Sequence, residues 1–399
     1  MIRSPFHAAA LLAFWLLYAH YFSLGHGGGW DCETYYYAAS AAQHGLDPYS
    51  PEKLAAVAKR PVALPFLYPP ATLLLFTPLT WMSVSTAVSV WLGIKLALFA
   101  LLLWLWHKRF LRDTDAIILS MVAALGFNAA PLWDLRGGNV AILESLLLWW
   151  AFACYVQERR TAFAALVVLA SVFKIVPILF LVLLLVPSKR EPARPVLAIG
   201  GVAALAAFAL LPVLLGPPWA SNFLRSAASV RPTGVVNPCA LGIFDTLLGS
   251  GRPGSQGPAH LPILLWAAFC GTLAGLSWPA IRMAWDARNP LRWVLVSVFL
   301  FVLLSPRPMI YSYLMLVPPV MALATPILKR FGGQFSLAAL LIAPVLARRF
   351  GLIPASFLAD NSPFFLALGI WLLYVVTRGG RTGGSSVVGG APSRTGGRA

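Results

Sequence analysis

The amino-acid sequence predicts an all-α polytopic membrane protein, and three observations support this fold class. The 399-residue chain is 59% hydrophobic and only 11% charged, whereas soluble domains carry about 25% charged residues. Its mean hydropathy is +0.78. Apolar runs recur from residue 8 to residue 377, and several reach the roughly 20 residues that an α-helix needs to cross a bilayer. So much apolar surface requires lipid around it.

The two ends of the chain differ from its centre in composition. Residues 1–25 contain one arginine followed by an apolar core, which predicts an uncleaved signal anchor; a cleaved signal peptide is the alternative. In either case residue 25 onward emerges on the far side of the membrane. Residues 378–399 form a Gly/Ser/Arg-rich stretch with nothing to bury, so we expect a disordered cytoplasmic tail. Residues 1–377 are predicted to form a single integral-membrane domain.

Basic residues set the expected orientation in the membrane. Lysine and arginine favour cytoplasmic loops, and on this rule both termini are cytoplasmic and two larger external loops remain, at about 23–66 and 216–260. The net charge of +17 also raises nucleic acid as a partner. The basic residues, however, lie mostly in short loops between helices, so we expect membrane lipids and no nucleic acid. The clusters assigned to the cytoplasm are Arg3; His107, Lys108, Arg109 and Arg112; Arg159 and Arg160; Lys189, Arg190 and Arg194; Arg282, Arg288 and Arg292; Lys329 and Arg330; Arg378 and Arg381.

Two intervals between these clusters predict helical hairpins. Only 28 residues separate Arg160 from Lys189, so two short helices, about 161–172 and 174–187, are expected to rise and return with Lys174 at the tip. The segment "SPRPMIYSY" (305–313) predicts a second hairpin with Arg307 at its tip. Such tips require a cavity lined by protein. The whole pattern predicts about twelve membrane helices.

Three features depart from this simple pattern. Lys95 falls within a predicted span, and Arg348 and Arg349 fall on the external side. The segment "YPPATLLLFTPLTWM" (68–82) is short and proline-rich, so it either re-enters the membrane or crosses it.

The cysteines and the first acidic residues show no pattern typical of a metal site. The four cysteines show no metal-ligand spacing. Cys32 and Cys239 both fall on the external side, so they either form a disulfide or stay as free buried thiols. Asp31 and Glu33 are two residues apart and point in different directions on a helix. We therefore expect neither a metal site nor a cofactor.

Ionisable residues near a membrane cavity are functional candidates, and here they converge on the external side. Asp31 and Glu33 belong to the first external loop, and Asn237 to the second; "LWDLRGGNV" supplies Arg136 and Asn139, and Lys174, Arg307 and Tyr311 belong to the hairpin tips. A carboxylate accepts a proton from an attacking hydroxyl, while Lys and Arg hold a phosphate as it leaves. One base with several cations predicts glycosyl transfer from a polyprenyl-phosphate sugar.

Each candidate also has a structural interpretation. Asp31 fits the N-cap of the helix that starts "CETYYYAAS". Lys174 fits a snorkelling side chain or the partner of a single structural acid, and Arg307 between two prolines fits a helix end. The tyrosines at 35–37 fit an interfacial aromatic belt. Asp47 in "GLDPY" fits a turn.

The ordered motifs resemble those of family 87 glycosyltransferases. "WDCETYYYAASAAQHGLDPYSPEKL" is similar to that family's first-loop pattern, approximately W-D-F-x-x-Y-Y-x-A-A followed by G-x-D-P-Y. "YPPATLLLFTPL" resembles its Y-P-P segment, "RGGNVAILESLLL" a helix start, and "FKIVPILFLVLLL" its K-x-x-P segment. "NPCALGIF" and "SPRPMIYSYLMLVPP" resemble its last two landmarks. The resemblance covers roughly residues 8 to 377.

This resemblance implies a GT-C type fold with juxtamembrane helices in the external loops, in a bacterial inner membrane with the active site on the periplasmic side. It implies a polyprenyl-phosphate hexose, typically mannose, as donor and an envelope lipid or glycan as acceptor. Asp31 would be the base, and Lys174, Arg307 and Arg136 would bind the donor phosphate. The residues expected to line the substrate cavity are Glu33, Tyr35, Tyr36, Tyr68, Asn139, Asn237 and Tyr311.

The chain departs from the family pattern at two places. Cys32 stands where the motif has an aromatic residue, and Tyr311 and Tyr313 stand where some members have a histidine pair. Other functions remain alternatives. They are a transporter or flippase for polyprenyl-linked sugars or lipids, a ligase-like enzyme with a diphosphate donor, and a scaffold subunit.

Overall fold

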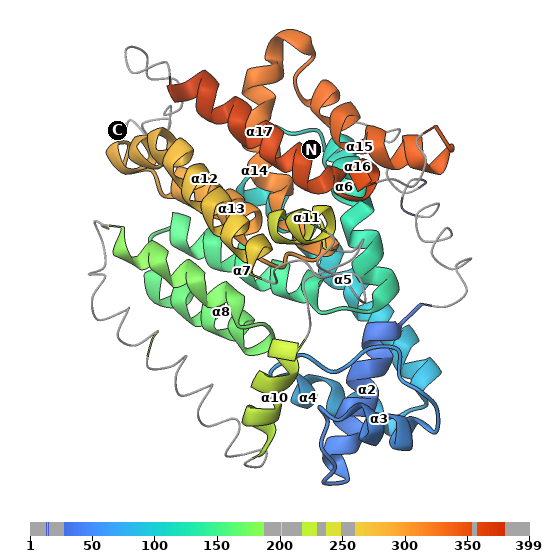
Figure 1. Ribbon diagram of the computed structural model, residues 1–399. Coiled ribbons are helices and arrows are strands. Elements are labelled where there is room, and N and C mark those ends of the chain that lie inside the picture. Colours follow the sequence, from blue (N-terminus) through green and yellow to red (C-terminus); the bar gives the residue numbers. More distant parts are fainter. Residues whose placement is uncertain are drawn as a thin grey trace, which may run out of the picture.

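A computed structural model describes residues 28–186, 218–229, 237–248, 260–352 and 357–379, together with the isolated residues 13, 15 and 201. All regular structure in these residues is helical (Figure 1), which confirms the predicted all-α class. Apart from residues 13 and 15, the expected signal anchor lies outside the described residues, as do the Lys189 cluster and the tail beyond Gly379.

Four helical segments of the described chain are long and apolar enough to cross a membrane. They are α5 (Val84–Arg109), α6 (Ala116–Gly137), α12 (Leu261–Asp286) and the continuous stretch of η3 (Ile310–Leu316) and α14 (Val317–Ile327). Shorter apolar helices are α7 (Ala141–Val156), α8 (Arg160–Phe173), η2 (Val176–Leu185), α13 (Pro290–Leu304) and α17 (Ser362–Gly379). The protein is therefore a helical membrane protein, and the total of about twelve spans stays a prediction.

Polar caps fix the starts of the principal helices. Ser83 accepts a hydrogen bond from the Thr86 backbone N–H at the start of α5. Asp115 accepts at 2.8 Å from the Ile117 N–H at the start of α6. Asn289 does the same for α13, which has Pro290 as its first residue. Each cap satisfies N–H groups that a helix cannot pair internally, so the loops between apolar runs end where these residues stand.

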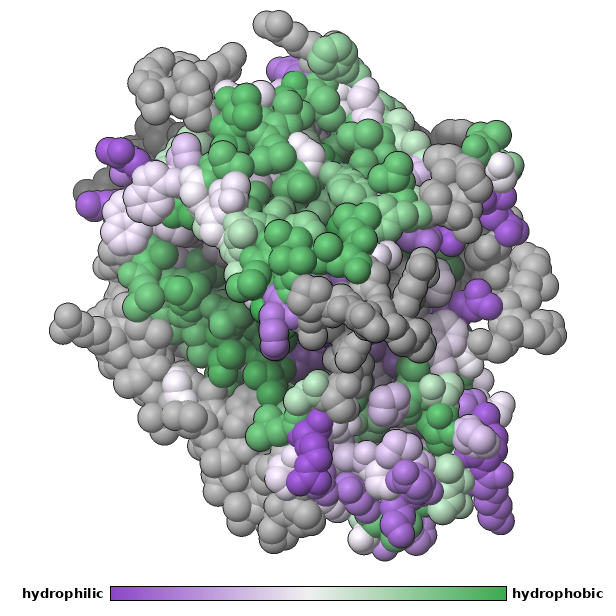
Figure 2. Space-filling model, viewed as in Figure 1, coloured by the Kyte–Doolittle hydropathy of each residue, from purple (hydrophilic) through white to green (hydrophobic). Residues whose placement is uncertain are grey.

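The surface divides into an apolar part and a polar end. In Figure 2 hydrophobic residues gather over the region where Figure 1 places α12 and α13. Leu264, Leu276 and Trp278 of α12 are more than half exposed. Hydrophilic residues gather at the opposite end of this face, around α2 (Trp30–Gln43) and α3 (Pro51–Ala58). An exposed apolar helix surface is what lipid contact requires.

The polar end is a small module of its own, which we call the external module after the side of the membrane that the sequence predicts for it. It consists of α2, α3, α4 (Ala71–Phe76), η1 (Thr77–Trp81) and α10 (Pro218–Ser229), grouped at one end of the molecule (Figure 1). Its core is aromatic: the Tyr35 ring lies 4.5 Å from Phe76 and 6.3 Å from Phe66, centroid to centroid. The helical part of segment 68–82 is only α4 and η1, which at about 1.5–2 Å per residue is shorter than the bilayer core.

The two predicted hairpins have counterparts in the structure. Lys174 lies between α8 and η2, and the buried Arg160 side chain donates to the Leu184 carbonyl at 3.0 Å and to the Val186 carbonyl, which ties the bases of the hairpin together. The second limb is a 3₁₀-helix rather than the expected α-helix. Arg307 lies in the turn between α13 and η3.

The remaining elements complete the bundle, and α15 and α16 pack near a break in α6. They are α11 (Ala240–Leu247), η4 (Leu328–Phe331), α15 (Gln334–Arg349) and α16 (Phe357–Asp360). Within α6 the backbone leaves helical geometry from Gly126 to Ala129, where three residues in succession have positive φ. At this break the Asn128 side-chain amide donates to the Ala359 carbonyl at 2.9 Å, which links the interrupted part of α6 to α16.

Candidate active site

Glycines bring α2 into contact with the end of α6. The Gly29 N–H donates to the Arg136 carbonyl at 2.7 Å. Gly138 has φ +76°, and a Cβ atom there would lie 2.6 Å from the Cys32 Cβ. Only glycine combines this left-handed backbone with so close an approach. The segments "GGGWDC" and "LRGGN" therefore pack against each other through their backbones.

This contact sets Asp31 against the end of α6. A Cβ atom at Gly137 would lie 3.0 Å from the Asp31 Oδ2. Asp31 is the second residue of α2, while the N-cap is Gly29, which has no capping side chain. The structure thus excludes the N-cap interpretation of Asp31 and leaves its carboxylate directed toward the α6–α7 turn.

A buried ion pair stabilises the α6–α7 turn. The Lys95 Nζ lies 2.8 Å from the Asp134 Oδ2, both side chains are almost fully buried, and Nζ also donates to the Asp134 carbonyl. The Asp134 Oδ1 accepts from the Ala141 N–H at 3.2 Å, at the start of α7. The Trp91 indole donates to the Gly138 carbonyl at 2.8 Å. Sequence reasoning missed this pair, although a lysine within a span is a signal for a buried acid.

One amide organises the polar groups around Asp31. The Asn139 Nδ2 lies 3.1 Å from the Asp31 Oδ2, 2.6 Å from the Tyr68 hydroxyl and 3.0 Å from the Tyr311 hydroxyl. Because an amide nitrogen carries two hydrogens, it can donate to at most two of these partners at once. The predicted residues Asp31, Tyr68, Asn139 and Tyr311 therefore meet, and they come from four separate parts of the chain.

The surroundings of Asp31 make its carboxylate a stronger base than a free aspartate. Burial raises the pKa of Asp31 from 3.8 to about 6. The Asn139 hydrogen bond lowers this pKa and the nearby Asp134 charge raises it. Desolvation dominates because the charged form loses more hydration than one amide returns. At neutral pH the group is ionised and still basic enough to take up a proton.

Lys174 reaches the same cluster from the tip of its hairpin. Its Nζ lies 2.7 Å from the Glu144 Oε2 and 5.0 Å from the centroid of the Tyr311 ring. Both side chains of the ion pair are partly accessible, at 22% and 14%. Lys174 therefore has the single acidic partner that the structural interpretation expects, and it also lies against the ring whose hydroxyl contacts Asn139. Glu144 was missed at the sequence level.

Three further predicted cavity residues differ in their placement. Tyr35 is buried, and its ring meets that of Tyr68 edge to face at 4.8 Å. Tyr36 is directed elsewhere, because successive helix residues point about 100° apart, and its hydroxyl donates to the Met82 carbonyl at 2.9 Å. Glu33 pairs with the exposed Arg60 at 2.6 Å, on the surface of the external module.

The remaining predicted residues have contacts outside the Asp31 cluster. The Arg136 side chain is exposed. It is the backbone carbonyl of Arg136 that takes part in the contact with α2, where it accepts from the Gly29 N–H. Arg307 lies close to Cys239, whose thiol donates to the Pro306 carbonyl at 3.2 Å. Asn237 is buried just before that segment. The landmarks "NPCALGIF" and "SPRPMIYSY" thus pack on each other, and the Tyr313 hydroxyl joins them by donating to the Pro238 carbonyl.

The positions of the cysteines decide between a disulfide and free thiols. Cys32 is buried under Gly138 and Cys239 lies against Pro306. All four cysteines are free thiols, so the disulfide alternative is wrong. In the described part of the chain, no group of three or more His, Cys, Asp or Glu side chains is arranged to hold a metal ion.

Comparison with known proteins gives one positive result. A sequence model described as "Glycosyltransferase family 87" matches residues 66–306, more than half of the chain. Curated proteins and solved structures gave no match. The matched region contains Tyr68, Asn139 and Lys174, whereas Asp31 lies before it and Tyr311 after it. The chain belongs to glycosyltransferase family 87.

Proposed function

We propose that this glycosyltransferase transfers a hexose, for which mannose is the first candidate, from a polyprenyl-phosphate donor to an envelope lipid or glycan. One observation carries the proposal. A carboxylate of raised pKa and a lysine at the tip of a membrane hairpin are joined through Asn139 and Tyr311. A base and a cation so close together suit a reaction in which a hydroxyl loses a proton while a phosphate departs.

The proposed reaction is a single displacement with inversion. The acceptor oxygen forms a bond to the anomeric carbon, and the bond from that carbon to the phosphate oxygen breaks with its electron pair on the phosphate. Asp31 receives the acceptor proton. Because a phosphate is a good leaving group, no second acid has to protonate it, unlike the paired carboxylates of most glycoside hydrolases. Asn139 orients the carboxylate, and holding both substrates in line supplies much of the rate.

Lys174 is the proposed cation for the donor phosphate. Glu144 fixes its position at 2.7 Å, and the Tyr311 ring lies beneath it. A lysine held by one carboxylate keeps two N–H donors for a phosphate. Arg307, in the turn between α13 and η3, and Arg136, in the last helical turn of α6, remain proposed auxiliary cations for the lipid phosphate. No metal or organic cofactor is part of the proposed reaction.

The remaining parts of the proposal concern architecture and location. We infer a GT-C type fold of about twelve spans in a bacterial inner membrane, with both termini cytoplasmic and the external module on the periplasmic side. Support comes from the basic cluster at the C-terminal end of α5, His107 to Arg109, which lies at the opposite end of that helix from the external module. Positive charge of this kind favours the cytoplasmic face.

The decisive test supplies purified protein in lipid nanodiscs with radiolabelled polyprenyl-phosphate mannose and a mixture of envelope lipids. We expect label in a new product and release of polyprenyl phosphate in equal amount. Mass spectrometry of co-purified lipids separates monophosphate from diphosphate donors. Movement of the labelled lipid across liposomes without any product would contradict the proposal and favour a transporter.

The acidic limb of the pH profile is a direct consequence of the Asp31 environment. The base must be ionised, so kcat/KM should fall about tenfold per unit below the pKa of Asp31, which is about 6, and level off above it. Asn139→Leu removes the hydrogen bond that lowers this pKa and should move the limb to higher pH. Initial rates from about pH 5 to about pH 8 measure the acidic limb of the wild type and its shift in Asn139→Leu. A wild-type profile that is flat through pH 6 would exclude Asp31 as the base.

Replacement of Lys174 should weaken donor binding more than acceptor binding. Lys174→Met removes charged hydrogen bonds of about 1.5–3 kcal/mol, so the KM for the donor should rise roughly ten- to a hundredfold. The single variant also leaves Glu144 without its partner. The double variant Lys174→Met/Glu144→Gln removes that unpaired charge and should recover stability while the donor KM stays high. A normal donor KM in the double variant would contradict the assignment.

A further inference from the structure

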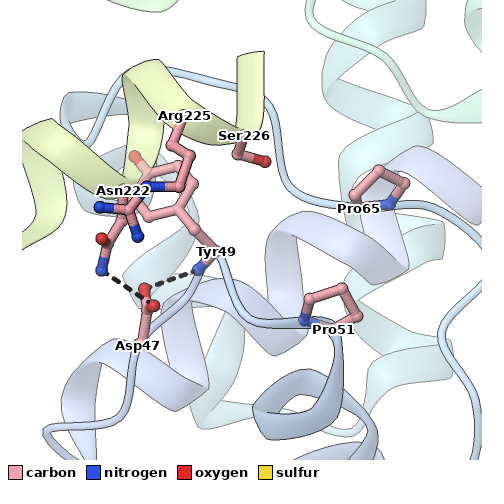
Figure 3. Close-up of a pocket in the computed structure, with 7 residues that line it drawn as sticks. All are labelled: Asp47, Tyr49, Pro51, Pro65, Asn222, Arg225 and Ser226. Atoms are coloured by element: carbon pink, nitrogen blue, oxygen red, sulfur yellow. Dashed lines mark hydrogen bonds between the residues drawn. The ribbon is translucent and has the colours of Figure 1, made fainter. Parts of the chain in front are cut away.

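The external module contains a cavity that the proposed reaction does not use. It measures about 280 Å³ and lies between α10 and the chain segments on either side of α3 (Figure 3). This is close to the lower limit, about 300 Å³, of pockets that hold small molecules. Its volume suits a single ring-sized group rather than a lipid chain.

One end of the cavity is polar and ordered. The Asp47 Oδ2 accepts from the Asn222 amide at 2.9 Å, and its Oδ1 accepts from the Tyr49 N–H at 3.0 Å. Figure 3 shows Asp47, Asn222 and the end of Arg225 gathered on one side. Each carboxylate oxygen has a second lone pair, so Asp47 is held in place and can still accept from a ligand.

Arg225 is the donor that faces this acid. Its side chain is exposed, and among the described residues none accepts a hydrogen bond from its guanidinium. A guanidinium offers five N–H donors. Asp47 therefore stabilises the turn, as the sequence predicts. Together with Arg225 it also gives the cavity one acidic and one basic group.

The other end of the cavity is apolar. The rings of Pro51 and Pro65 line it (Figure 3), together with the buried Tyr49. Flat hydrocarbon and ring surfaces beside a few directed polar groups are the usual lining of a small-molecule site. The arrangement requires a ligand with one apolar face and an edge that both donates and accepts hydrogen bonds.

Charge decides between the possible ligands. An isolated phosphate or carboxylate would meet the Asp47 carboxylate as well as Arg225, and like charges within a few ångströms repel. A neutral sugar does not have this difficulty, because its hydroxyls donate to Asp47 and accept from Arg225. Its C–H face packs against the proline and tyrosine rings. A hexopyranose meets every requirement of the cavity.

We infer that this cavity binds a neutral hexose unit of the acceptor glycan, outside the membrane and apart from the reacting atoms. The inference rests on the proposed function. Its connection to the active site is visible in the contacts: the Tyr49 hydroxyl donates at 2.9 Å to the carbonyl of Tyr68, whose own hydroxyl contacts Asn139. Phe66 lies between the two tyrosine rings, at 5.3 and 6.0 Å. A glycan held here is anchored to the wall of the Asp31 cluster.

The test measures sugar binding separately from transfer. Saturation-transfer NMR is recorded on the full chain in phospholipid nanodiscs with the methyl α-glycosides of mannose, glucose and galactose. At least one glycoside should bind the wild type, and Arg225→Met should weaken its Kd about tenfold. Asn222→Ala provides a second lesion in the cavity. Lys53→Met, which removes an exposed charge of the same module, is the matched control and should bind as the wild type does.

The outcomes separate this inference from the proposed reaction. Asp31→Asn should keep glycoside binding and lose hexose transfer. Binding thus tests the cavity assignment and transfer tests the proposed reaction, so each proposal can fail independently of the other. Equal binding by the wild type, Arg225→Met and Asn222→Ala would overturn the cavity assignment. Displacement of the glycoside by polyprenyl-phosphate mannose would assign the cavity to the donor sugar and overturn the acceptor assignment. Displacement by inorganic phosphate would overturn the choice of a neutral ligand.

Discussion

Asp31→Asn should lower kcat for hexose transfer by about 10² to 10⁴, the usual contribution of a general base. The substitution preserves the shape of the side chain and removes only its ability to accept a proton as a carboxylate. The exchange hardly changes the size of the side chain, and Gly137 beside it has no Cβ that could crowd the new amide. The side-chain oxygen of the new amide can still accept from Asn139. The KM values for donor and acceptor should therefore change little.

Three measurements make this prediction specific. Initial rates are determined with purified wild type and variant at equal concentration, and thermal midpoints show that both are folded. Glu52→Gln is the matched control, since Glu52 is an exposed acid of the same module, and it should retain wild-type activity. Transfer by stably folded Asp31→Asn at the wild-type rate would exclude Asp31 as the base and with it the proposed mechanism.

Lys95→Met should destabilise the protein by about 3–5 kcal/mol, because it leaves Asp134 as a buried acid without its charged partner. The double variant Lys95→Met/Asp134→Leu should recover most of this loss, since both charges then disappear and their desolvation cost with them. The pair also holds the turn that carries Asn139: Asp134 accepts from the Ala141 N–H at 3.2 Å. The double variant should thus be stable and still impaired in transfer.

A surface pair provides the comparison for this prediction. Arg60→Met breaks the ion pair with Glu33, whose partners are 52% and 28% exposed, and exposed pairs contribute only about 0–1 kcal/mol. Unfolding in mixed detergent, followed by tryptophan fluorescence, ranks the three variants. Equal stability of Lys95→Met and Arg60→Met would show that the buried pair does not hold the α6–α7 turn.

Several properties follow from the sequence because they depend on composition and on neighbouring residues. Apolar runs determine the all-helical membrane class, since lipid accepts only backbones that are hydrogen-bonded internally. Basic clusters and short spacings locate the hairpin with Lys174 at its tip. The sequence also singles out Asp31, Asn139, Tyr68 and Tyr311, although it contains no measure of the distances among them.

The tertiary structure alone decides which of these residues meet. The glycine contact between Gly29 and the end of α6 places Asp31 beside Asn139, 108 positions later in the chain. Helix rotation turns Tyr35 inward and Tyr36 toward Met82. The partners of Lys95 and Lys174, namely Asp134 and Glu144, follow from helix packing. Local sequence determines where helices form and what they can bury; long-range packing determines which charges share one buried space, and hence which of them can act together.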